Sequence, residues 1–333
     1  MDNIVLTTKS FAKVRVMVVG DFMLDKSFFG EVTRVSPEST VPVFLEQYKT
    51  FTPGGAGNST VNIAALGAHV LTVGTLGNDE HAENFMESIT SLVGKLPGGI
   101  DTSGLELSDN AQTTTKIRFF ATNRNNMPTG LRHDKETPGL HVDDKNKIVN
   151  TIIANKNYYD VVLLSDYSKG IAKKGVVFAI KNLGIPLIVD PRTAAYLSYA
   201  DARLIKPNDH EARAMLSKLD PRYDPSDTQP AIQEVGLGLQ ARYNTNILIT
   251  MGKDGMMLFE TEREPYHIQP IYRGEHIDVT GAGDTVAAVV TTAIGAGWPL
   301  RDSANLANLA ASIAVTKIGT AHVTIDELIE KLR

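Results

Sequence analysis

Short apolar runs, rich in β-branched residues, alternate along the chain with longer stretches in which apolar residues recur at helical spacing. Runs of this kind are typical of strands that are buried on both faces. The predicted buried strands are residues 14–19, 70–76, 161–164, 187–189, 203–205 and 247–250. Because helical material separates most of them, the pattern predicts a parallel sheet with helices on both of its faces.

Two further β-branched runs, at 41–48 and 113–121, do not fit this alternation. We interpret them as a small separate sheet that acts as a lid. Segments 94–112 and 122–139 are rich in turn-forming and polar residues and are interpreted as loops. The other predicted elements are helices at 58–66, 79–93, 285–294 and 302–316, and a hairpin formed by 256–260 and 266–270.

Composition narrows the class of protein. The chain has 333 residues, 42% hydrophobic and 21% charged, which permits one large α/β domain or two small ones. A net charge of −5 without a basic run gives no reason to expect a nucleic-acid partner. There is no cysteine, so disulfides and thiolate chemistry are excluded. The N-terminal segment does not resemble a secretory signal and no apolar run is long enough to span a membrane, so we expect a cytoplasmic protein.

The stretch DVTGAGDTV, residues 278–286, directly precedes a predicted helix. Gly281 and Gly283 allow the backbone to turn sharply there, and a helix N-terminus offers free N–H groups to an anion. Asp284 would repel that anion, which makes sense if the carboxylate removes a proton from a group attacking it. The alternative is an ordinary strand–helix turn. Neither GxGxxG nor the GxxxxGK[ST] P-loop is present.

A second glycine-rich turn, PGGAGN at residues 53–58, also leads into a helix. Asp21 and Asp25 follow the first strand, and ligands of open α/β sheets bind beyond the carboxyl ends of strands. Asp21, Gly54, Gly55 and Asn58 can therefore converge on a polyhydroxylated ligand. As a lone residue, Asp21 is equally well explained as a loop or capping residue.

Two more stretches each have two interpretations. In NDHE, 208–211, Asn208 and Glu211 have the spacing of a helix capping box, but the same oxygens suit a magnesium ion. TMGKDG, 250–255, is either a hairpin turn or a flat surface for a nucleotide. The histidines show no metal-binding spacing, and GxSxG and HExxH are absent.

Taken together and in this order, the four stretches resemble the ribokinase-like (phosphofructokinase-B, or PfkB) family of carbohydrate kinases. The resemblance runs from about residue 14 to 320 and rests on PGGAGNSTVNIAALG, NDHE, TMGKDG and DVTGAGDTV. It implies an α/β fold with a doubly wound, mostly parallel sheet and a small β-sheet lid. It further implies a single domain over residues 1–333, with lid segments near 22–50 and 112–135.

The resemblance also implies roles for individual residues. Asp284 would be the base that takes the proton of a sugar hydroxyl. The N–H groups of Ala282, Gly283 and Asp284, in the turn that begins at Gly281, would form an anion hole for the transferred phosphoryl group. ATP and Mg²⁺ would be required, with Asn208 and Glu211 supporting the ion. The nucleotide would lie near Asn208, Thr250, Gly252, Gly255 and Asn308, and the sugar near Asp21, Asp25, Gly54, Gly55 and Asn58.

Within the family, TTTKIRFFA (113–121), LRHD (131–134), LLSDYSKG (163–170) and KIGTAHV (317–323) look like the D-glycero-β-D-manno-heptose 7-phosphate kinases. This branch phosphorylates C1 of a heptose that already carries a phosphate, on the route to ADP-heptose. Arginine and lysine side chains would then meet the 7-phosphate. The candidates are Arg34, Lys116, Arg118, Arg132 and Lys169. The alternatives are another PfkB sugar kinase or a catalytically idle sensor of sugar or nucleotide.

Three departures from the branch concern the sugar: GGAGNST in the glycine turn, a longer loop before LRHD, and DPRT at 190–193. Some relatives bind a monovalent cation where this chain has Asp278 and Thr280, and many dimerise through the lid, which would pair exposed strand edges. We therefore expect a homodimer. Bifunctional relatives carry a nucleotidyl-transferring domain after the kinase, and since this chain ends at Arg333 we expect the kinase activity alone.

Overall fold

The fold was analysed on a computed structural model of the chain. The structure describes residues 9–122, 127–136, 141–192, 199–220, 222–223, 230–272, 279–317, 319 and 321–332. Within these residues, no helix has both the length and the apolar character needed to cross a membrane.

The body of the molecule is built on a sheet that contains nine strands among the described residues, in the order β13-β12-β11-β10-β9-β8-β1-β4-β5. Pairing is parallel from β5 to β11, and β12 and β13 continue antiparallel. The mostly parallel sheet of the ribokinase-like fold is therefore confirmed. The strands are β1 (Arg15–Gly20), β4 (His69–Gly77), β5 (Ile100–Ser108), β8 (Val161–Asp166), β9 (Leu187–Pro191), β10 (Leu204–Ile205), β11 (Ile247–Thr250), β12 (Met256–Phe259) and β13 (Tyr266–Ile268).

Helices cover both faces of this sheet. In β1, Val16 and Val18 belong to one hydrophobic core, and Met17 and Val19 to the other, because successive side chains point to opposite faces. Helices of the first core are α2 (Ala56–Ala65), α3 (Glu80–Thr90), α8 (Ala282–Gly295), α9 (Leu300–Ala314) and α10 (Ile325–Leu332). Helices of the second core are α4 (Val142–Ala154), α5 (Lys174–Lys181), α6 (Asp209–Leu219) and α7 (Ile232–Tyr243).

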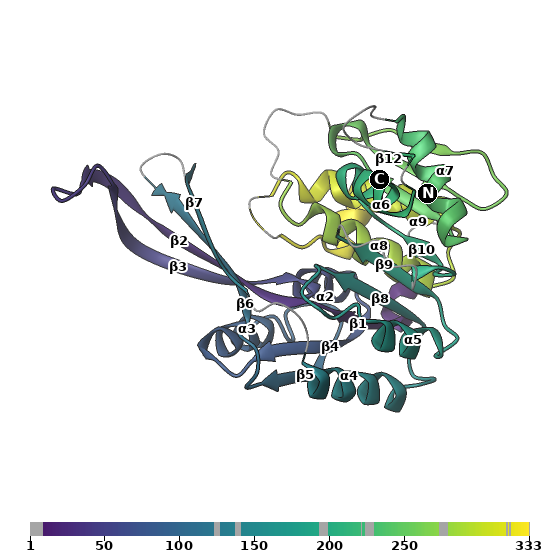
Figure 1. Cartoon of the computed structure of the whole chain (residues 1–333), viewed down its shortest axis with the longest axis horizontal. Coiled ribbons are helices and arrows are strands. Elements are labelled where there is room, and N and C mark those ends of the chain that lie inside the picture. The colour runs from purple at the N-terminus through teal and green to yellow at the C-terminus, as the bar shows by residue number, and fades with distance from the viewer. Residues whose placement is uncertain are drawn as a thin grey trace.

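A second sheet projects from the body as a long arm (Figure 1). Its strand order among the described residues is β3-β2-β6-β7, formed by β2 (Phe22–Val35), β3 (Pro42–Gly55), β6 (Thr114–Ala121) and β7 (Met127–Lys135). Stacked rings hold the arm together, with Phe29 packed on Tyr48 and on Phe120 at centroid distances of 4.7 and 5.1 Å. The small β-sheet lid is confirmed as part of the fold, and its base lies where β3 leads into α2.

Several local predictions were wrong. The segment 94–112 contains the edge strand β5, and the segment 122–139 contains β7. The long strand β2 lies inside the lid segment expected near 22–50 but was not predicted as a strand, and the last helix, α10, was not predicted. β5 alternates exposed and buried positions irregularly and contains Gly104, so its strand character comes from pairing with β4 and not from a hydrophobic pattern.

Candidate active site

A cavity of about 280 Å³ opens at the carboxyl ends of the central strands, between the body and the base of the lid. Residues at or just beyond the ends of β8, β9, β10 and β11 line one side of it, lid strands β2 and β6 line another, and the start of α8 closes it. Strand ends meet here because all these body strands run parallel, and such an edge is where α/β proteins bind ligands.

Asp284 lies on the wall of this cavity in the first turn of α8, with only 6% of its surface exposed. The hydroxyl of Tyr167 donates to its Oδ1 at 2.6 Å, and Nδ2 of Asn58 donates to its Oδ2 at 2.8 Å. Burial, reinforced by the charge of Asp190, raises the pKa of Asp284 to about 6, although both hydrogen bonds and Lys206 oppose the rise. The carboxylate is thus a stronger base than an exposed one yet is still mostly ionised at pH 7.

The turn before Asp284 presents the helix end to the cavity. Gly281 caps α8 with a φ of 78°, a left-handed conformation that glycine adopts without strain. The N–H of Ala282 is partly engaged, because it donates to the carbonyl of Val279 at 3.3 Å. The nearest atom that a Cβ on Gly283 would meet is Nζ of Lys206, at 3.8 Å. Gly283 therefore leaves room for an anion between the positive end of the helix and a lysine.

Four cationic side chains line the cavity: Lys116, Arg118, Arg192 and Lys206. Lys206 is 3% exposed and lies 2.9 Å from Asp190. Burial alone would lower the pKa of Lys206, but Asp190 and Glu211 raise it overall, so the ammonium stays charged. Burial lowers the pKa of Lys116. Five carboxylates line the same cavity among the described residues: Asp25, Asp166, Asp190, Glu211 and Asp284. The cations are thus interspersed with acids, and arginine and lysine in such a cavity suit a phosphorylated ligand.

Tyr167 connects these cations to the carboxylate. Nζ of Lys116 lies 5.0 Å from the centroid of its ring, and the guanidinium carbon of Arg192 lies 4.7 Å from it. Both are within the range of cation–π contacts. The Tyr167 ring thus places two positive charges beside the group that its hydroxyl contacts, Asp284.

The predicted sugar residues divide into two groups. Asp25, Gly55 and the cavity-lining Arg118 lie together, and Nη1 of Arg118 is 2.6 Å from Oδ1 of Asp25. Gly55 has a φ of 57°, and a Cβ there would lie 2.6 Å from Cε of Met23. A Cβ on Gly55 would also lie 2.7 Å from the carbonyl oxygen of Asp21, so this position does not accept a larger residue. A Cβ on Gly54 would lie 2.6 Å from Oδ2 of Asp25 and would displace that carboxylate. Asn58 reaches the site through its contact with Asp284.

Asp21 is placed differently from what the sequence suggested. Its carboxylate accepts the N–H groups of Tyr167, Lys169 and Ile171, at 2.8, 3.0 and 3.2 Å. In the described part of the chain it does not line the cavity that holds Asp284. Asp21 therefore shapes the loop that carries Tyr167, and the loop-residue interpretation fits its position better than a direct contact with sugar.

The candidate phosphate ligands also divide. Among the described residues, Lys116 and Arg118 line the cavity, whereas Arg34, Arg132 and Lys169 do not. Arg34 is exposed on the outer part of the arm. Arg132 pairs through two hydrogen bonds with Asp134, and Nζ of Lys169 lies 2.5 Å from Glu136. The side chains of Arg132 and Lys169 are thus each already paired with a nearby carboxylate.

The sequence interpretation missed Tyr167, Asp190, Arg192 and Lys206 as members of the site. Each directly follows β8, β9 or β10, or ends one of these strands. The rule that ligands bind at carboxyl ends of parallel strands, applied beyond the first strand, would have found them.

A second cavity of about 460 Å³ adjoins the first. Thr250, Gly252, Gly255 and Asn308 line it together with Asn208, so all the predicted nucleotide residues come together. The two cavities share Asn208, Thr250, Val279 and Gly283. Apolar side chains dominate the rest of its wall, as a base and ribose require: Met256, Pro270, Ile271, Val286, Ala311 and Val315.

The candidate metal ligands form a capping box. The N–H of Glu211 donates to Oδ1 of Asn208, and the N–H of Asn208 donates to Oε2 of Glu211, both at 2.8 Å. Both residues nevertheless line the first cavity, and Oε1 of Glu211 faces Arg192 at 3.5 Å. No cluster of three His, Cys, Asp or Glu residues suited to a metal occurs among the described residues. Thr280 lines the cavity, and Asp278 lies outside the described residues.

Phosphoryl transfer to an alcohol needs a nucleotide pocket and an acceptor pocket that meet beside a base and a hole for the moving anion. The ribokinase-like body and lid hold the two cavities in that relation, which defines the class as carbohydrate kinases. The chain belongs to the pfkB family of carbohydrate kinases, which it matches over residues 13–327. It is therefore an ATP-dependent sugar kinase.

Curated relatives match nearly the whole chain. Bifunctional protein HldE of Gluconobacter oxydans is 36% identical over 322 residues, which are 96% of this chain and 64% of that protein. Bifunctional protein HldE of Caulobacter vibrioides is 38% identical over 332 residues, again 96% of this chain and 64% of that protein. The chain thus spans a little under two thirds of the length of these relatives.

Solved structures share the fold. Phosphofructokinase-2 from Escherichia coli in complex with potassium superposes with a TM-score of 0.74 at 17% identity, over 95% of this chain and 97% of the other. Arabidopsis thaliana ribokinase complexed with ribose and ATP gives 0.69 at 19% identity, over 96% and 98%. The ribokinase-like fold class is confirmed by both.

Proposed function

We propose that the protein transfers the γ-phosphoryl group of ATP to the C1 hydroxyl of D-glycero-β-D-manno-heptose 7-phosphate, a step of ADP-heptose biosynthesis. The observation that carries the proposal is the position of Asp284, where a nucleotide-sized cavity joins a smaller cavity lined by four cations. Relatives that bear the HldE name over 96–98% of the chain support the choice of sugar.

In this proposal Asp284 accepts the proton of the anomeric hydroxyl as the phosphoryl group arrives. Tyr167 and Asn58 hold the two carboxylate oxygens, which leaves the group with one orientation toward the cavity. The N–H groups that begin α8, with Lys206, meet the negative charge on the transferred group. These donors are fixed before the reaction, so they stabilise the transition state without reorganisation.

Magnesium fits the oxygen atoms of Glu211 and Asn208, which would hold it directly or through water. Glu211 is buried, lines the cavity, and is a hard oxygen ligand of the kind that Mg²⁺ prefers. When bound, the ion would neutralise the charge of the ATP phosphates. Thr280 stands at the cavity wall, where a monovalent cation is a further expectation.

The phosphate already on the sugar would meet Arg118, Lys116 and Arg192. Arg118 shares its charge with Asp25, which is 5% exposed and can accept a sugar hydroxyl beside the guanidinium. A sugar without the phosphate would leave these cationic side chains without an anionic partner. Since unpaired charge in a partly buried site is costly, the site disfavours such sugars.

Closure of the lid over the sugar would exclude water and so limit ATP hydrolysis. The arm ends in the edge strands β3 and β7, and exposed strand edges are prone to pair with other chains. We propose a homodimer through this sheet, in which one lid supports the other.

The test is an ADP-release assay with Mg·ATP and five acceptors: the β-heptose 7-phosphate, its dephosphorylated form, ribose, fructose and fructose 6-phosphate. Turnover restricted to the heptose 7-phosphate is expected, with Asp284→Asn inactive as the control. Turnover on another sugar would retain the kinase and refute the heptose. A protein that binds ATP and turns over none of the five would favour the second candidate, a sensor, which the intact Asp284 argues against.

A further inference from the structure

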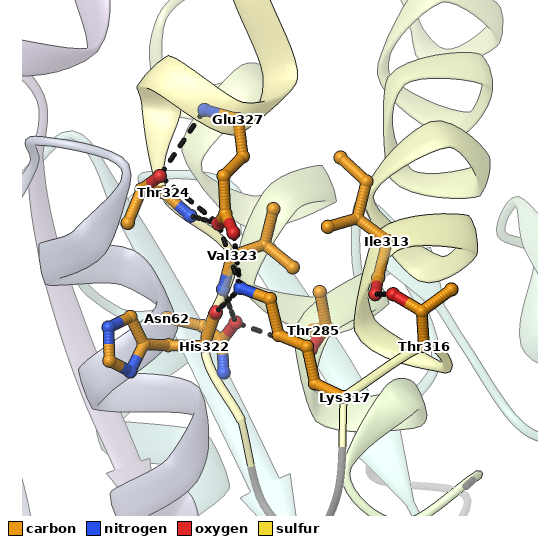
Figure 2. A network of polar contacts seen from close by, with 9 residues as sticks. All are labelled: Asn62, Thr285, Ile313, Thr316, Lys317, His322, Val323, Thr324 and Glu327. Atoms are coloured by element: carbon orange, nitrogen blue, oxygen red, sulfur yellow. Dashed lines mark hydrogen bonds and ion pairs between the residues drawn. The ribbon is translucent and has the colours of Figure 1, made fainter. Parts of the chain in front are cut away.

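A chain of side-chain amides runs from the catalytic carboxylate to the C-terminal segment. Asn62, one helical turn beyond Asn58 in α2, is almost fully buried. Its Nδ2 donates to Oδ1 of Asn58 at 3.2 Å and to the Asn58 carbonyl at 3.0 Å. Its Oδ1 accepts the N–H of Val323 and the hydroxyl of Thr285, each at 3.2 Å (Figure 2).

The donor and acceptor roles in this series of hydrogen bonds are fixed at both of its ends. A backbone N–H can only donate, so the atom of Asn62 that faces Val323 must be the oxygen. The amide nitrogen of Asn62 then faces Oδ1 of Asn58, and Nδ2 of Asn58 is directed to Asp284. At the other end, an ionised carboxylate can only accept, which demands the same orientation of Asn58. Neither amide can flip without placing two donors or two acceptors together.

The segment that supplies the Val323 N–H is itself anchored. Thr324 and Glu327 form a capping pair at the start of α10, in which the N–H of Thr324 donates to Oε2 of Glu327 at 2.8 Å. Nζ of Lys317 donates to the His322 carbonyl at 2.7 Å and lies 2.6 Å from Oε1 of Glu327. Figure 2 shows these groups around Val323, between α2 and the end of α9. The N–H of Val323 is thus held in place from both sides.

We propose that Asn62 is a positioning residue for proton transfer, which orients the Asn58 amide toward Asp284 and is itself held by the N–H of Val323. This inference rests on the proposed role of Asp284 as the base. It assigns a function to residues 321–327: through Val323 they support the geometry of the active site, although none of them lines the cavity of Asp284 in the described structure.

The consequence for Asp284 is an acid–base property that a purely structural residue would not affect. The other groups that face Asp284 are Tyr167 after β8, Asp190 on β9, Lys206 after β10 and Lys116 on β6. None of them contacts Asn62 in the described structure, so they stay the same when Asn62 is changed. Loss of a donated hydrogen bond to a carboxylate removes stabilisation of its charged form, and the pKa rises.

The experiment compares Asn62→Leu with Thr60→Val. Thr60 is buried in the same helix, and its hydroxyl donates only to the carbonyl of Ala56 among the described residues, at 2.9 Å. Asn62→Leu is expected to move the acid limb of the kcat profile upward by about one pH unit and to lower kcat about fivefold at pH 6. The KM for Mg·ATP should not change. Thr60→Val is expected to lower Tm comparably but to leave the acid limb in place.

A direct titration separates this inference from the proposed function. The Asp284 carboxyl is followed by ¹³C NMR without substrate, and its resonance is assigned by its loss in Asp284→Asn. A rise in the apparent pKa of Asp284 in Asn62→Leu that is absent in Thr60→Val supports the positioning role of Asn62, even if no sugar is turned over. An unchanged pKa, or the same change in both variants, overturns it.

If Asn62→Leu does not fold, Lys317→Met is the second variant. It removes the contacts of Lys317 with Glu327 and with the His322 carbonyl, and the Lys317 side chain is partly exposed. The expected shift then has the same direction and about half the size. A Lys317→Met protein that is destabilised but titrates like the parent would show that the C-terminal segment contributes stability alone, and the proposal would be wrong.

Discussion

Tyr167→Phe is the sharpest test of whether Tyr167 sets the basicity of Asp284, because the substitution removes only the hydroxyl oxygen. The hydroxyl donates to Oδ1 of Asp284 at 2.6 Å, and this hydrogen bond lowers the pKa of a carboxyl that burial raises to about 6. A hydrogen bond to a charged group contributes about 1.5–3 kcal/mol, or roughly one to two pKa units. Since water in the cavity can replace part of it, we take about one unit. The ring itself remains beside Lys116 and Arg192.

The predicted effect depends on pH. With a pKa near 7 in place of 6, the ionised fraction of Asp284 at pH 6 falls from about one half to about one tenth. Turnover of Tyr167→Phe at pH 6 should therefore be about fivefold below the parent, and nearly equal at pH 9. The assay is the pH profile of kcat with saturating Mg·ATP and sugar.

Tyr199→Phe is the matched control. Its hydroxyl also donates to a buried aspartate, Asp166, but not to Asp284. This variant should keep the acid limb of the parent. Superimposable profiles of Tyr167→Phe and the parent, or a loss of turnover that is the same at every pH, would refute the reasoning that Tyr167 sets the basicity of Asp284.

Four further predictions follow from the site. Asp284→Asn should abolish nearly all turnover while the affinity for Mg·ATP, measured by calorimetry, changes less than a few-fold. Folding raises the pKa of Asp284 from 3.8 to about 6, so ionisation of this carboxyl destabilises the fold as pH rises through 6. At pH 8 the unfolding free energy of Asp284→Asn should therefore exceed that of the parent by up to about 3 kcal/mol, with a higher Tm. At pH 4 the two proteins should be equally stable. Arg118→Met should raise KM for the phosphorylated sugar at least tenfold, whereas its cross-strand neighbour variant Arg132→Met should not; equal effects would place the phosphate elsewhere. Gly255→Ala should weaken ATP binding or unfold the turn, because φ is +83° and a Cβ would lie 2.1 Å from the carbonyl of Ile268; a variant with parental ATP affinity and Tm would contradict this.

The elements whose sequence signal is local were predictable from the sequence. The body strands are continuous apolar runs because both of their faces are buried, and this pattern survives without any knowledge of neighbours. The glycine turn before α8 and the capping box at Asn208 are likewise local codes. By contrast β5, β7 and the long β2 have mixed burial or many polar residues, and only pairing with neighbouring strands makes them strands.

The contacts around the base could not be predicted from local patterns. Asp284 itself was predicted, but its two hydrogen-bonding partners are 117 and 226 residues away in the chain. The sequence also could not tell which cations face the cavity, because Arg118 and Arg132 are paired neighbours in the lid and only one of them lines it. Whether a lid cation faces the cavity depends on the direction in which its side chain points from the strand and on the carboxylates that lie close enough to pair with it.

The sequence by itself therefore determined the class of fold, the family and the position of the proposed catalytic carboxylate, because the motifs that indicate each consist of residues adjacent in the chain. Only the tertiary structure decided that Asp21 holds a loop, that Tyr167 and Asn58 hold Asp284, and that Lys206 and Arg192 belong to the site. The physical reason is that hydrogen bonds and charge pairing act between atoms a few ångströms apart, and the fold determines which distant segments come that close.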